Sequence, residues 1–224
     1  MQGLTFKVEG TYFNCFRKPE STSTILTYPI PPFTTIRGLV ANSMGLKQFP
    51  YYDREKYLAL QGLRIGIRPL RPGEKSVELS KILKLISREE KPCFKRTFPS
   101  APMFREFLVN PNYRIYIFGN GGLVEEISEK IENPERPFYL GQSDDMIDIE
   151  DVKLVEGTET RNREISSVVK GVHERCEVVR LPFKFSSDGT VLEEMTVSIP
   201  KEFPYRLEEE TDCLLCDNEF VCAY

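Results

Sequence analysis

A proline-rich segment that ends at a helix start constrains this chain more than any other feature. Residues 28–32 read Tyr-Pro-Ile-Pro-Pro. Because proline fixes φ and disfavours helical geometry in the residue before it, we expect this segment to be extended. Thr34 and Thr35 follow as candidate N-caps. Apolar residues then recur at helical spacing up to Gly45, a typical helix stop, and they are Ile36, Leu39, Val40 and Met44. The sequence therefore predicts an extended lead-in and a helix over residues 35–44.

The start of this predicted helix also suits an anion. Its first turn offers free backbone N–H groups, two threonine hydroxyls and the guanidinium of Arg37, all of which donate hydrogen bonds to phosphate. The opposite face has small side chains that would let a ligand approach closely, namely Gly38, Ala41, Asn42 and Gly45. A capped helix packed on a sheet would show the same pattern, so the residues alone leave both interpretations open.

Two segments alternate apolar and polar side chains, which is the pattern of half-buried strands. The first covers residues 4–8 and the second covers residues 63–68. The second presents Arg64 and Arg68 on its polar face. We therefore expect a strand at each position, with two guanidinium groups of the second strand able to grip phosphates.

Residues 69–100 interrupt this pattern and read as an insertion. Its apolar residues have helical spacing, and they are Leu79, Ile82, Leu83 and Ile86. The insertion ends in a cluster of positive charge at Lys91, Lys95 and Arg96. A basic, partly helical finger would suit RNA binding, because loop insertions often carry function. A solvated helix with ordinary lysines explains the same residues.

Residues 105–118 give the clearest hairpin signal, with two strand-like runs around the Asn-Pro-Asn of residues 110–112. A glycine-rich turn follows, and after it comes a helix with the apolar stripe Val124, Ile127 and Ile131. Residues 152–155 supply a last strand. The order strand, helix, insertion, strand, strand, helix, strand is that of a ferredoxin-like domain, the arrangement of RNA-recognition motifs. The aromatic signature with which those motifs stack bases is absent.

We therefore predict an α+β protein with a ferredoxin-like (RRM-like) domain over residues 1–155 and a small β-rich region over residues 156–224. In the second region, Ser-Ser-Asp-Gly at residues 186–189 is a turn signal between two strand-like runs. From Glu208 the chain is acidic and then apolar. Because no low-complexity linker separates the regions, we expect the second to pack on the first.

Charge is segregated along the chain. The 224 residues carry a net charge of −4, but residues 1–53 carry +2, residues 54–105 carry +8 and residues 106–224 carry −14. Phosphate binding depends on the local field, so a basic middle is compatible with RNA, and Arg105 becomes a candidate contact on charge alone. The composition is that of a globular protein without a membrane-spanning run or a signal peptide, so we expect a cytoplasmic location.

Residues with catalytic or metal-binding chemistry are sparse. His173 is the only histidine, which leaves no evident pairing of nucleophile and base. Cys213 and Cys216 have Cys-x-x-Cys spacing and Cys222 could add a third thiolate, but a closed zinc site normally needs four ligands. The carboxylates of residues 144–151 are local, whereas two-metal sites collect carboxylates from several elements. We therefore expect no cofactor, no metal and no catalytic residue.

Two separated segments resemble the Cas-five family of CRISPR-associated proteins, of the RAMP superfamily. One is Pro-Pro-Phe-Thr-Thr-Ile-Arg-Gly-Leu at residues 31–39, which follows a β-type N-terminus. The other is Pro-Phe-Tyr-Leu-Gly-Gln-Ser-Asp-Asp at residues 137–145, which resembles that family's Tyr-Leu-Gly-x-Ser-Asp/Glu segment. The resemblance covers about residues 1–155.

The resemblance implies a non-catalytic, crRNA-binding subunit of a type I CRISPR surveillance (Cascade) complex in antiviral defence. Such subunits hold the 5′ handle of the crRNA and cap the backbone filament, in contact with the backbone (Cas-seven type) and large (Cas-eight type) subunits. Residues of the two matched segments become candidate RNA contacts, namely Thr34, Thr35, Arg37, Gln142 and Ser143.

One branch of the family cuts CRISPR repeat RNA with a tyrosine, a lysine and a histidine. This chain has no histidine before His173, which lies outside both matched segments, so that activity is not carried over. A repeat-RNA endoribonuclease of the same fold, and a protein–protein scaffold that never touches RNA, remain the alternatives.

Overall fold

The protein is described by a computed structural model, which places residues 1–19, 24–47, 52–83 and 100–224. Its helices are α1 (Phe33–Ser43), α2 (Arg54–Gln61) and α3 (Gly121–Glu132). The strands of the first two-thirds of the chain are β1 (Gln2–Gly10), β2 (Phe13–Asn14), β3 (Thr24–Ile25), β4 (Arg64–Arg71), β5 (Glu74–Leu83), β6 (Ser100–Val109), β7 (Asn112–Phe118) and β8 (Ile147–Glu156). The remaining strands are β9 (Thr158–Ile165), β10 (Val169–Lys170), β11 (Cys176–Phe185), β12 (Leu192–Pro200), β13 (Tyr205–Cys216) and β14 (Glu219–Val221). The predicted α+β class is confirmed.

The main sheet has the order β4-β7-β1-β8, and every neighbouring pair is antiparallel. The apolar side chains of β1 and β4 predicted to face the core are buried, and they share one cluster with the apolar stripes of α1 and α3. Helix α3 packs against β1 and β8 and also against α1. These two helices therefore bury one face of the sheet.

Helix α1 begins earlier than predicted, at Phe33. Pro32 occupies the N-cap position with an extended backbone and makes no side-chain cap hydrogen bond. The predicted threonine N-cap is therefore wrong: Thr34 and Thr35 lie inside the first turn, where the Thr35 N–H donates to the Pro32 carbonyl at 2.9 Å. The predicted stop is confirmed, since Gly45 follows the helix with a φ of +69°, which favours glycine.

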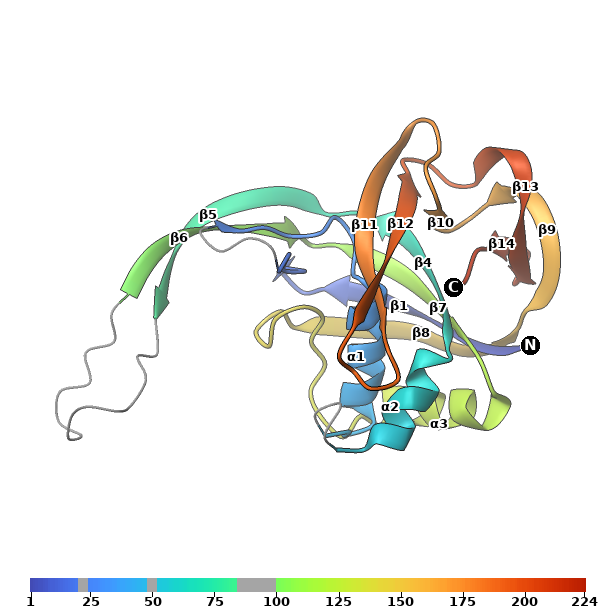
Figure 1. Cartoon of the computed structure of the whole chain (residues 1–224), viewed down its shortest axis with the longest axis horizontal. Coiled ribbons are helices and arrows are strands. Elements are labelled where there is room, and N and C mark those ends of the chain that lie inside the picture. Colours follow the sequence, from blue (N-terminus) through green and yellow to red (C-terminus); the bar gives the residue numbers. More distant parts are fainter. Residues whose placement is uncertain (20–23, 48–51, 84–99) are drawn as a thin grey trace.

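Strands β5 and β6 pair along their whole length, from Glu74 opposite Val109 to Leu83 opposite Ser100. They form an arm that projects away from the body of the molecule (Figure 1). The helix predicted in this insertion is therefore wrong where the structure describes it. The reason is that Val77 and Leu79 also alternate with polar neighbours, a period of two that favours a strand.

The hairpin predicted around residues 110–112 is also wrong. Strand β6 pairs with β2, β3 and β5, whereas β7 pairs with β1 and β4, so the two strands belong to different sheets. Gly73 and Asn110, both with positive φ, lie at the two junctions where β4 passes into β5 and β6 passes into β7. The chain thus leaves the main sheet along one strand of the arm and returns along the other.

The predicted C-terminal hairpin is confirmed, because β11 and β12 pair antiparallel around the Ser-Ser-Asp-Gly turn. The acidic segment after Glu208 is not a tail but part of β13, which pairs with β9 and β14. The C-terminal region packs on the first, as predicted. Phe33 contacts Phe183 and Tyr224 edge to face, and the backbones of Ile65 and Tyr224 exchange two hydrogen bonds.

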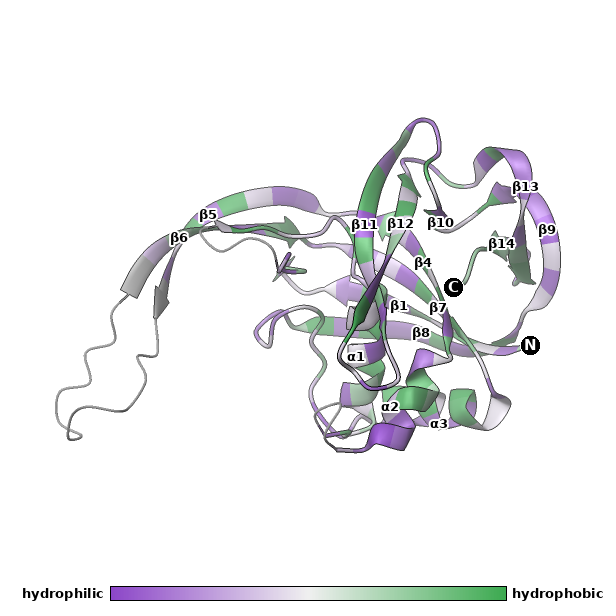
Figure 2. Cartoon of the chain, in the orientation of Figure 1, coloured by the Kyte–Doolittle hydropathy of each residue, from purple (hydrophilic) through white to green (hydrophobic). Residues whose placement is uncertain are grey.

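Hydropathy follows this packing. Figure 2 shows hydrophilic residues along much of β9, while the short strand β14, which faces the main sheet, is predominantly hydrophobic. Strand β14 contributes Val221 to a cluster with Tyr116 and Phe118 of β7. Among the described helices, none combines the length and apolar character needed to cross a bilayer.

Candidate nucleic-acid interface

The two segments that carry the family resemblance lie side by side in the structure. The Asn42 side chain of α1 donates to the Pro137 carbonyl at 2.9 Å. A small hollow of about 200 Å³ lies between the segments, and it is lined by Thr35, Gly38, Leu39, Tyr139 and Gly141. The hydroxyl-bearing Thr34 and Thr35 are half-buried there. Proximity of the two motifs is therefore a property of the fold.

Arg37 does not occupy the anion-binding position that the sequence suggested. Its side chain is 3% exposed, and its three guanidinium nitrogens donate to the carbonyls of Leu60, Leu63 and Phe183 at 3.1, 2.9 and 2.7 Å. Burial lowers the pKa of Arg37 to about 10, so it stays charged at neutral pH. In this fold Arg37 ties α1 to the α2–β4 junction and to β11, and its burial keeps the guanidinium out of reach of a phosphate.

Arg64 and Arg68 of β4 are likewise engaged within the protein. Arg64 pairs with Glu159 at 2.8 Å and also donates to the Ala223 carbonyl. Arg68 pairs with Glu219 and lies over the ring of Phe203. The polar face of β4 was expected to meet RNA, but the C-terminal strands cover it. The sequence could not show this, because the glutamates come more than 90 residues later.

The second matched segment is organised around a buried carboxylate, Asp145, which is 0% exposed. It accepts hydrogen bonds from the backbone N–H groups of Cys15 and Gln142 at 2.7 and 3.0 Å, and from the Arg105 guanidinium at 3.1 Å. Burial raises the pKa of Asp145, and the three donors oppose that shift. This carboxylate therefore fixes three elements together: the end of β2, the 139–145 loop and the base of the arm.

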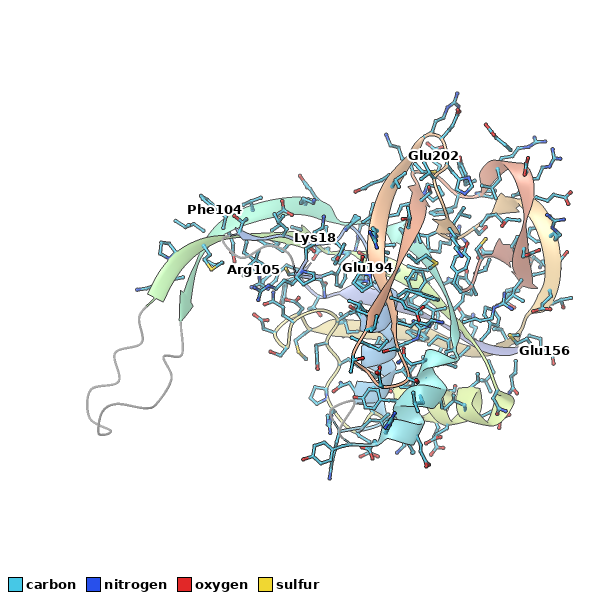
Figure 3. All side chains as sticks on the ribbon, viewed as in Figure 1. Lys18, Phe104, Arg105, Glu156, Glu194 and Glu202 are labelled. Carbon is cyan, nitrogen blue, oxygen red and sulfur yellow. The ribbon has the colours of Figure 1, made fainter. Side chains whose placement is uncertain are left out.

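A larger hollow, of about 520 Å³, opens where the arm meets the body. Its lining comes from five separate segments, and it consists of Arg17, Ile25, Glu78, Leu79, Ser80, Lys81, Arg105 and Gln142. Two predicted residues, Arg105 and Gln142, meet here. The Nε of Arg105 is buried and has no hydrogen-bond partner within the described residues. Figure 3 shows Lys18 close by at the arm base. We name this feature the arm-base hollow.

The arm-base hollow is lined by three cations, Arg17, Lys81 and Arg105, and by one anion, Glu78. Arg105 is ion-paired with Asp145 and Asp144, so Arg17 and Lys81 supply the positive charge that a ligand can reach. Arg17 and Lys81 are exposed, and neither stands out in the sequence, because only the pairing of the arm brings them to the same place. Ser143 is exposed at the turn beside Gln142. The remaining predicted contacts, Lys91, Lys95 and Arg96, lie outside the described residues.

Residues with redox, metal-binding or acid–base chemistry are placed elsewhere. Cys213, Cys216 and Cys222 are buried thiols, and burial raises the pKa of Cys216 and of Cys222 to about 11. No group of three or more metal-ligating side chains gathers in the parts of the chain that the structure places. His173 follows β10, where its Nε2 lies 3.0 Å from the Lys170 carbonyl. It is therefore not part of the arm-base hollow.

The fold is an α+β fold in which a projecting β-arm rises from an antiparallel sheet, and solved CRISPR-associated proteins share it. The structure described as "CRISPR RNA-guided surveillance complex" is 17% identical, with a TM-score of 0.56 over 89% of this chain and 91% of that chain. A CRISPR protein from Archaeoglobus fulgidus is 13% identical, with a TM-score of 0.57 over 99% of this chain and 98% of that chain. A structure described as "Crystal structure of Cas protein" is 17% identical, with a TM-score of 0.54, and the match covers 91% and 98% of the two chains.

The family follows from the sequence. Residues 3–208 match the family model described as "CRISPR-associated protein (Cas_Cas5)", and this chain therefore belongs to the Cas5 family. A search of curated protein sequences found no match. The match extends beyond the predicted limit near residue 155 and into the C-terminal strands.

Proposed function

We propose that this protein is a non-catalytic, guide-RNA-binding subunit of a CRISPR effector complex, of the type I surveillance class, and that it acts in the cytoplasm. The observation that carries this proposal is the arm-base hollow, where three cations and Gln142 meet beside the two family segments. Guanidinium and ammonium groups bind phosphates, and an amide side chain can hydrogen-bond a base edge. The substrate would be the 5′ handle of the crRNA.

The fold and the relatives support this assignment. The strand order β4-β7-β1-β8, with α1 and α3 on one face, fits a ferredoxin-like domain. One structural neighbour is described as an RNA-guided surveillance complex. As a subunit of such a complex, the chain would cap the backbone filament and contact the backbone and large subunits.

The face of the main sheet opposite α1 and α3 is a poor alternative site for RNA. Lys7 and Arg114 both contact Asp151, at 2.5 and 3.8 Å, and Arg71 pairs with Glu9. These ion pairs neutralise the cations of that face. Tyr116, the aromatic residue nearest to this charged network, is 2% exposed and donates to Glu219. Bases could not stack there without breaking the network, which favours the arm-base hollow.

Binding without cleavage fits the chemistry of the arm-base hollow. Its described lining has no histidine, cysteine or tyrosine, and its arginines stay protonated near neutral pH. The basic groups present can therefore hold a phosphate but are poorly suited to removing a proton from the attacking 2′-hydroxyl. Isolated chain incubated with unprocessed repeat RNA should leave it intact, and cleavage that disappears in a His173→Ala variant would instead support the endoribonuclease alternative.

A salt titration tests the RNA-binding proposal. The affinity for repeat-derived RNA should fall steeply as salt rises from about 50 to 200 mM, because phosphate contacts release counterions. The Arg17→Ala/Gln142→Ala variant should bind more weakly at every salt concentration, and the slope should fall by about 1 for the lost phosphate contact. Fluorescence anisotropy would measure both quantities, with the other subunits present if the isolated chain binds too weakly.

The matched control is Arg163→Ala/Lys201→Ala, which removes two exposed cations of the C-terminal region. It should leave the affinity within about two-fold of the wild type, because nonspecific charge loss far from the site has little effect at physiological salt. Equal losses for both double variants would contradict the assignment to the arm-base hollow. An assembled complex that incorporates the chain, while the chain shows no contribution to RNA affinity, would favour the scaffold alternative.

A further inference from the structure

The two faces of the arm differ in chemistry. Glu78 and Ser80 of β5, with Arg105 opposite Glu78 on β6, form one face and line the arm-base hollow. Val77 and Leu79 lie on the other face, where Phe104 is the direct cross-strand partner of Leu79. Figure 3 shows Phe104 and Arg105 on opposite sides of the arm. We call the face of Val77, Leu79 and Phe104 the outer face.

The outer face exposes large apolar side chains that nothing in the chain covers within the described residues. Val77, Leu79 and Phe104 are 56%, 65% and 55% exposed. Single exposed apolar residues are common on protein surfaces, but a contiguous group marks an interaction site. These three are contiguous, because Val77 and Leu79 are two residues apart on one strand and Phe104 is paired with Leu79.

The outer edge of β5 is also unpaired. Strand β6 pairs with β5 on one side and with β2 and β3 on the other, whereas β5 pairs only with β6 in the part of the chain that the structure places. Alternate N–H and C=O groups of an edge strand point away from its partner, and they form a template for another strand. An edge ten residues long, beside an apolar face, fits strand addition.

Charge on the outer face indicates the character of the partner. By strand alternation Lys75 and Lys81 share the face of Val77 and Leu79, one at each end, and Leu79 and Lys81 also line part of the arm-base hollow. A segment that reads acidic, apolar, apolar, acidic at alternate positions would match all four residues. A second copy of this chain would instead bring its own lysines and exposed apolar residues to the edge, which gives it no acidic complement at those two positions.

We propose that β5 receives an extended segment of a neighbouring protein subunit, which adds as a further strand and covers Val77, Leu79 and Phe104. The proposal rests on the proposed function only in that the neighbour belongs to the same complex. RNA is the weaker candidate for this face, because Phe104 is its one exposed aromatic ring among the described residues, and the aliphatic Val77 and Leu79 give successive bases no further platform. Lys75 is also partly neutralised by Glu106, at 3.6 Å.

The first test places a photo-crosslinking benzoylphenylalanine at position 77 of the full chain, co-expressed with the other subunits of its complex and the guide RNA. Val77 is exposed and does not line the arm-base hollow. A crosslink to an extended segment of a protein subunit is expected, and mass spectrometry identifies the peptide. The same probe at position 76, on the opposite face, should not reach that peptide. A crosslink from position 77 to RNA, or to no partner in the assembled complex, overturns the proposal.

Amide hydrogen exchange separates strand addition from side-chain contact alone. The outward N–H groups of β5 should exchange at least about ten-fold more slowly in the complex than in the isolated chain, because strand addition gives them carbonyl partners. Unchanged exchange in β5, together with a protein crosslink from position 77, overturns strand addition.

A pair of variants keeps this proposal distinct from the RNA site. Val77→Asp/Phe104→Asp, at two outer-face residues that do not line the arm-base hollow, should reduce incorporation of the neighbouring subunit at least about ten-fold, while RNA affinity of the chain stays within about two-fold of wild type. Arg17→Ala/Gln142→Ala should do the reverse. If the outer-face variant assembles normally, the outer-face proposal fails and the RNA site stands. If Arg17→Ala/Gln142→Ala binds RNA as tightly as the wild type, the proposed RNA site fails and the outer-face proposal stands.

Discussion

The body and the arm of this protein use the same kinds of residue in opposite ways. In the body, the arginine of the first family segment is buried, and three backbone carbonyls accept its hydrogen bonds. In the arm, Val77, Leu79 and Phe104 are more than half exposed. A cation in the interior and an apolar group at the surface both lower stability unless something compensates for them. In the body, carbonyl groups of the chain itself accept the hydrogen bonds of the buried arginine. In the arm, the exposed apolar side chains would be covered only by a partner.

This difference separates residues that hold the fold from residues that serve an interaction. Arg37 and Asp145 lie within the two matched segments, yet each is enclosed by groups of this chain. Arg17, Gln142 and the outer face of the arm lie at the surface. Substitutions in the first group should therefore change the free energy of unfolding, and substitutions in the second should change binding. The predictions below test that division, starting with the largest expected effect.

Replacing Arg37 by methionine should reduce the free energy of unfolding by about 3–4 kcal/mol. The methionine side chain has a similar length but leaves three buried carbonyls without their donors, and hydrogen bonds to charged groups contribute about 1.5–3 kcal/mol each before the relieved desolvation is subtracted. Urea denaturation would measure the change. Arg17→Ala is the control, because a surface substitution should stay within about 0.5 kcal/mol. Similar small changes for both would contradict the structural role of Arg37.

Alkaline pH should destabilise the body through its buried thiols. Burial raises the pKa of Cys216 and of Cys222 from 9.0 to about 11. A thiol whose pKa is raised in the folded state contributes to the free energy of unfolding. That contribution is fully present below pH 9 and is lost as the pH rises through 11, because the thiol loses its proton at a lower pH in the unfolded chain. Each thiol should account for about 2–3 kcal/mol by pH 11, at 1.36 kcal/mol per pKa unit.

The measurement is urea denaturation at a series of pH values from about 8 to 11. A Cys216→Ala/Cys222→Ala variant should be less stable than the wild type at pH 8 because it loses buried volume, but its stability should fall less steeply with pH. If the variant and the wild type decline in parallel, the thiols are not the source of the loss.

Asp145→Asn should reduce stability by about 2 kcal/mol, a smaller effect than at Arg37. The amide keeps the shape, but one of its two polar atoms becomes a donor that faces either the backbone N–H groups or the Arg105 guanidinium, which donate to the carboxyl in the wild type. Burial raises the pKa of Asp145 above 3.8. The contribution of this carboxyl is therefore fully present below pH 3.8 and declines as the pH rises through its folded-state pKa.

The stability difference between the wild type and Asp145→Asn should accordingly shrink as the pH increases from about 3.5 to 6. Asp144→Asn is a suitable control, because Asp144 is exposed and lies 3.8 Å from Arg105. It should change stability by less than about 0.5 kcal/mol. A widening difference over the same pH range would mean that the donors outweigh burial.

Local patterns predicted much of the body. Alternation identified β1 and β4, helical spacing identified α1 and α3, and the Ser-Ser-Asp-Gly turn identified the β11–β12 hairpin. Each of these signals lies within about ten neighbouring residues, and each element buries its own apolar face. Helix α2 was missed, because a two-turn helix with one buried residue has almost no apolar stripe.

The sequence-based predictions were wrong where segments far apart in the chain determine strand pairing or the burial of a side chain. The strand–turn–strand pattern around residues 110–112 predicts a hairpin. Instead β6 pairs with residues of β5 that lie 17 to 35 positions earlier, and β7 pairs with residues of β4 that lie at least 41 positions earlier. Arg37 reads as a surface cation until Phe183 closes over it, 146 residues later. The arm-base hollow combines residues 17, 81, 105 and 142, and no spacing rule could have grouped them.

Leu79→Ser should have the smallest effect on stability, within about 0.5 kcal/mol, because the side chain is already 65% exposed and buries little area on folding. Leu181→Ser on β11 is the matched control, since Leu181 is 0% exposed, and it should cost several kcal/mol. Thermal or urea unfolding of both variants measures the contrast. A large loss for Leu79→Ser would mean that the arm packs against the body, and the outer face would then be part of the fold and not available to a partner.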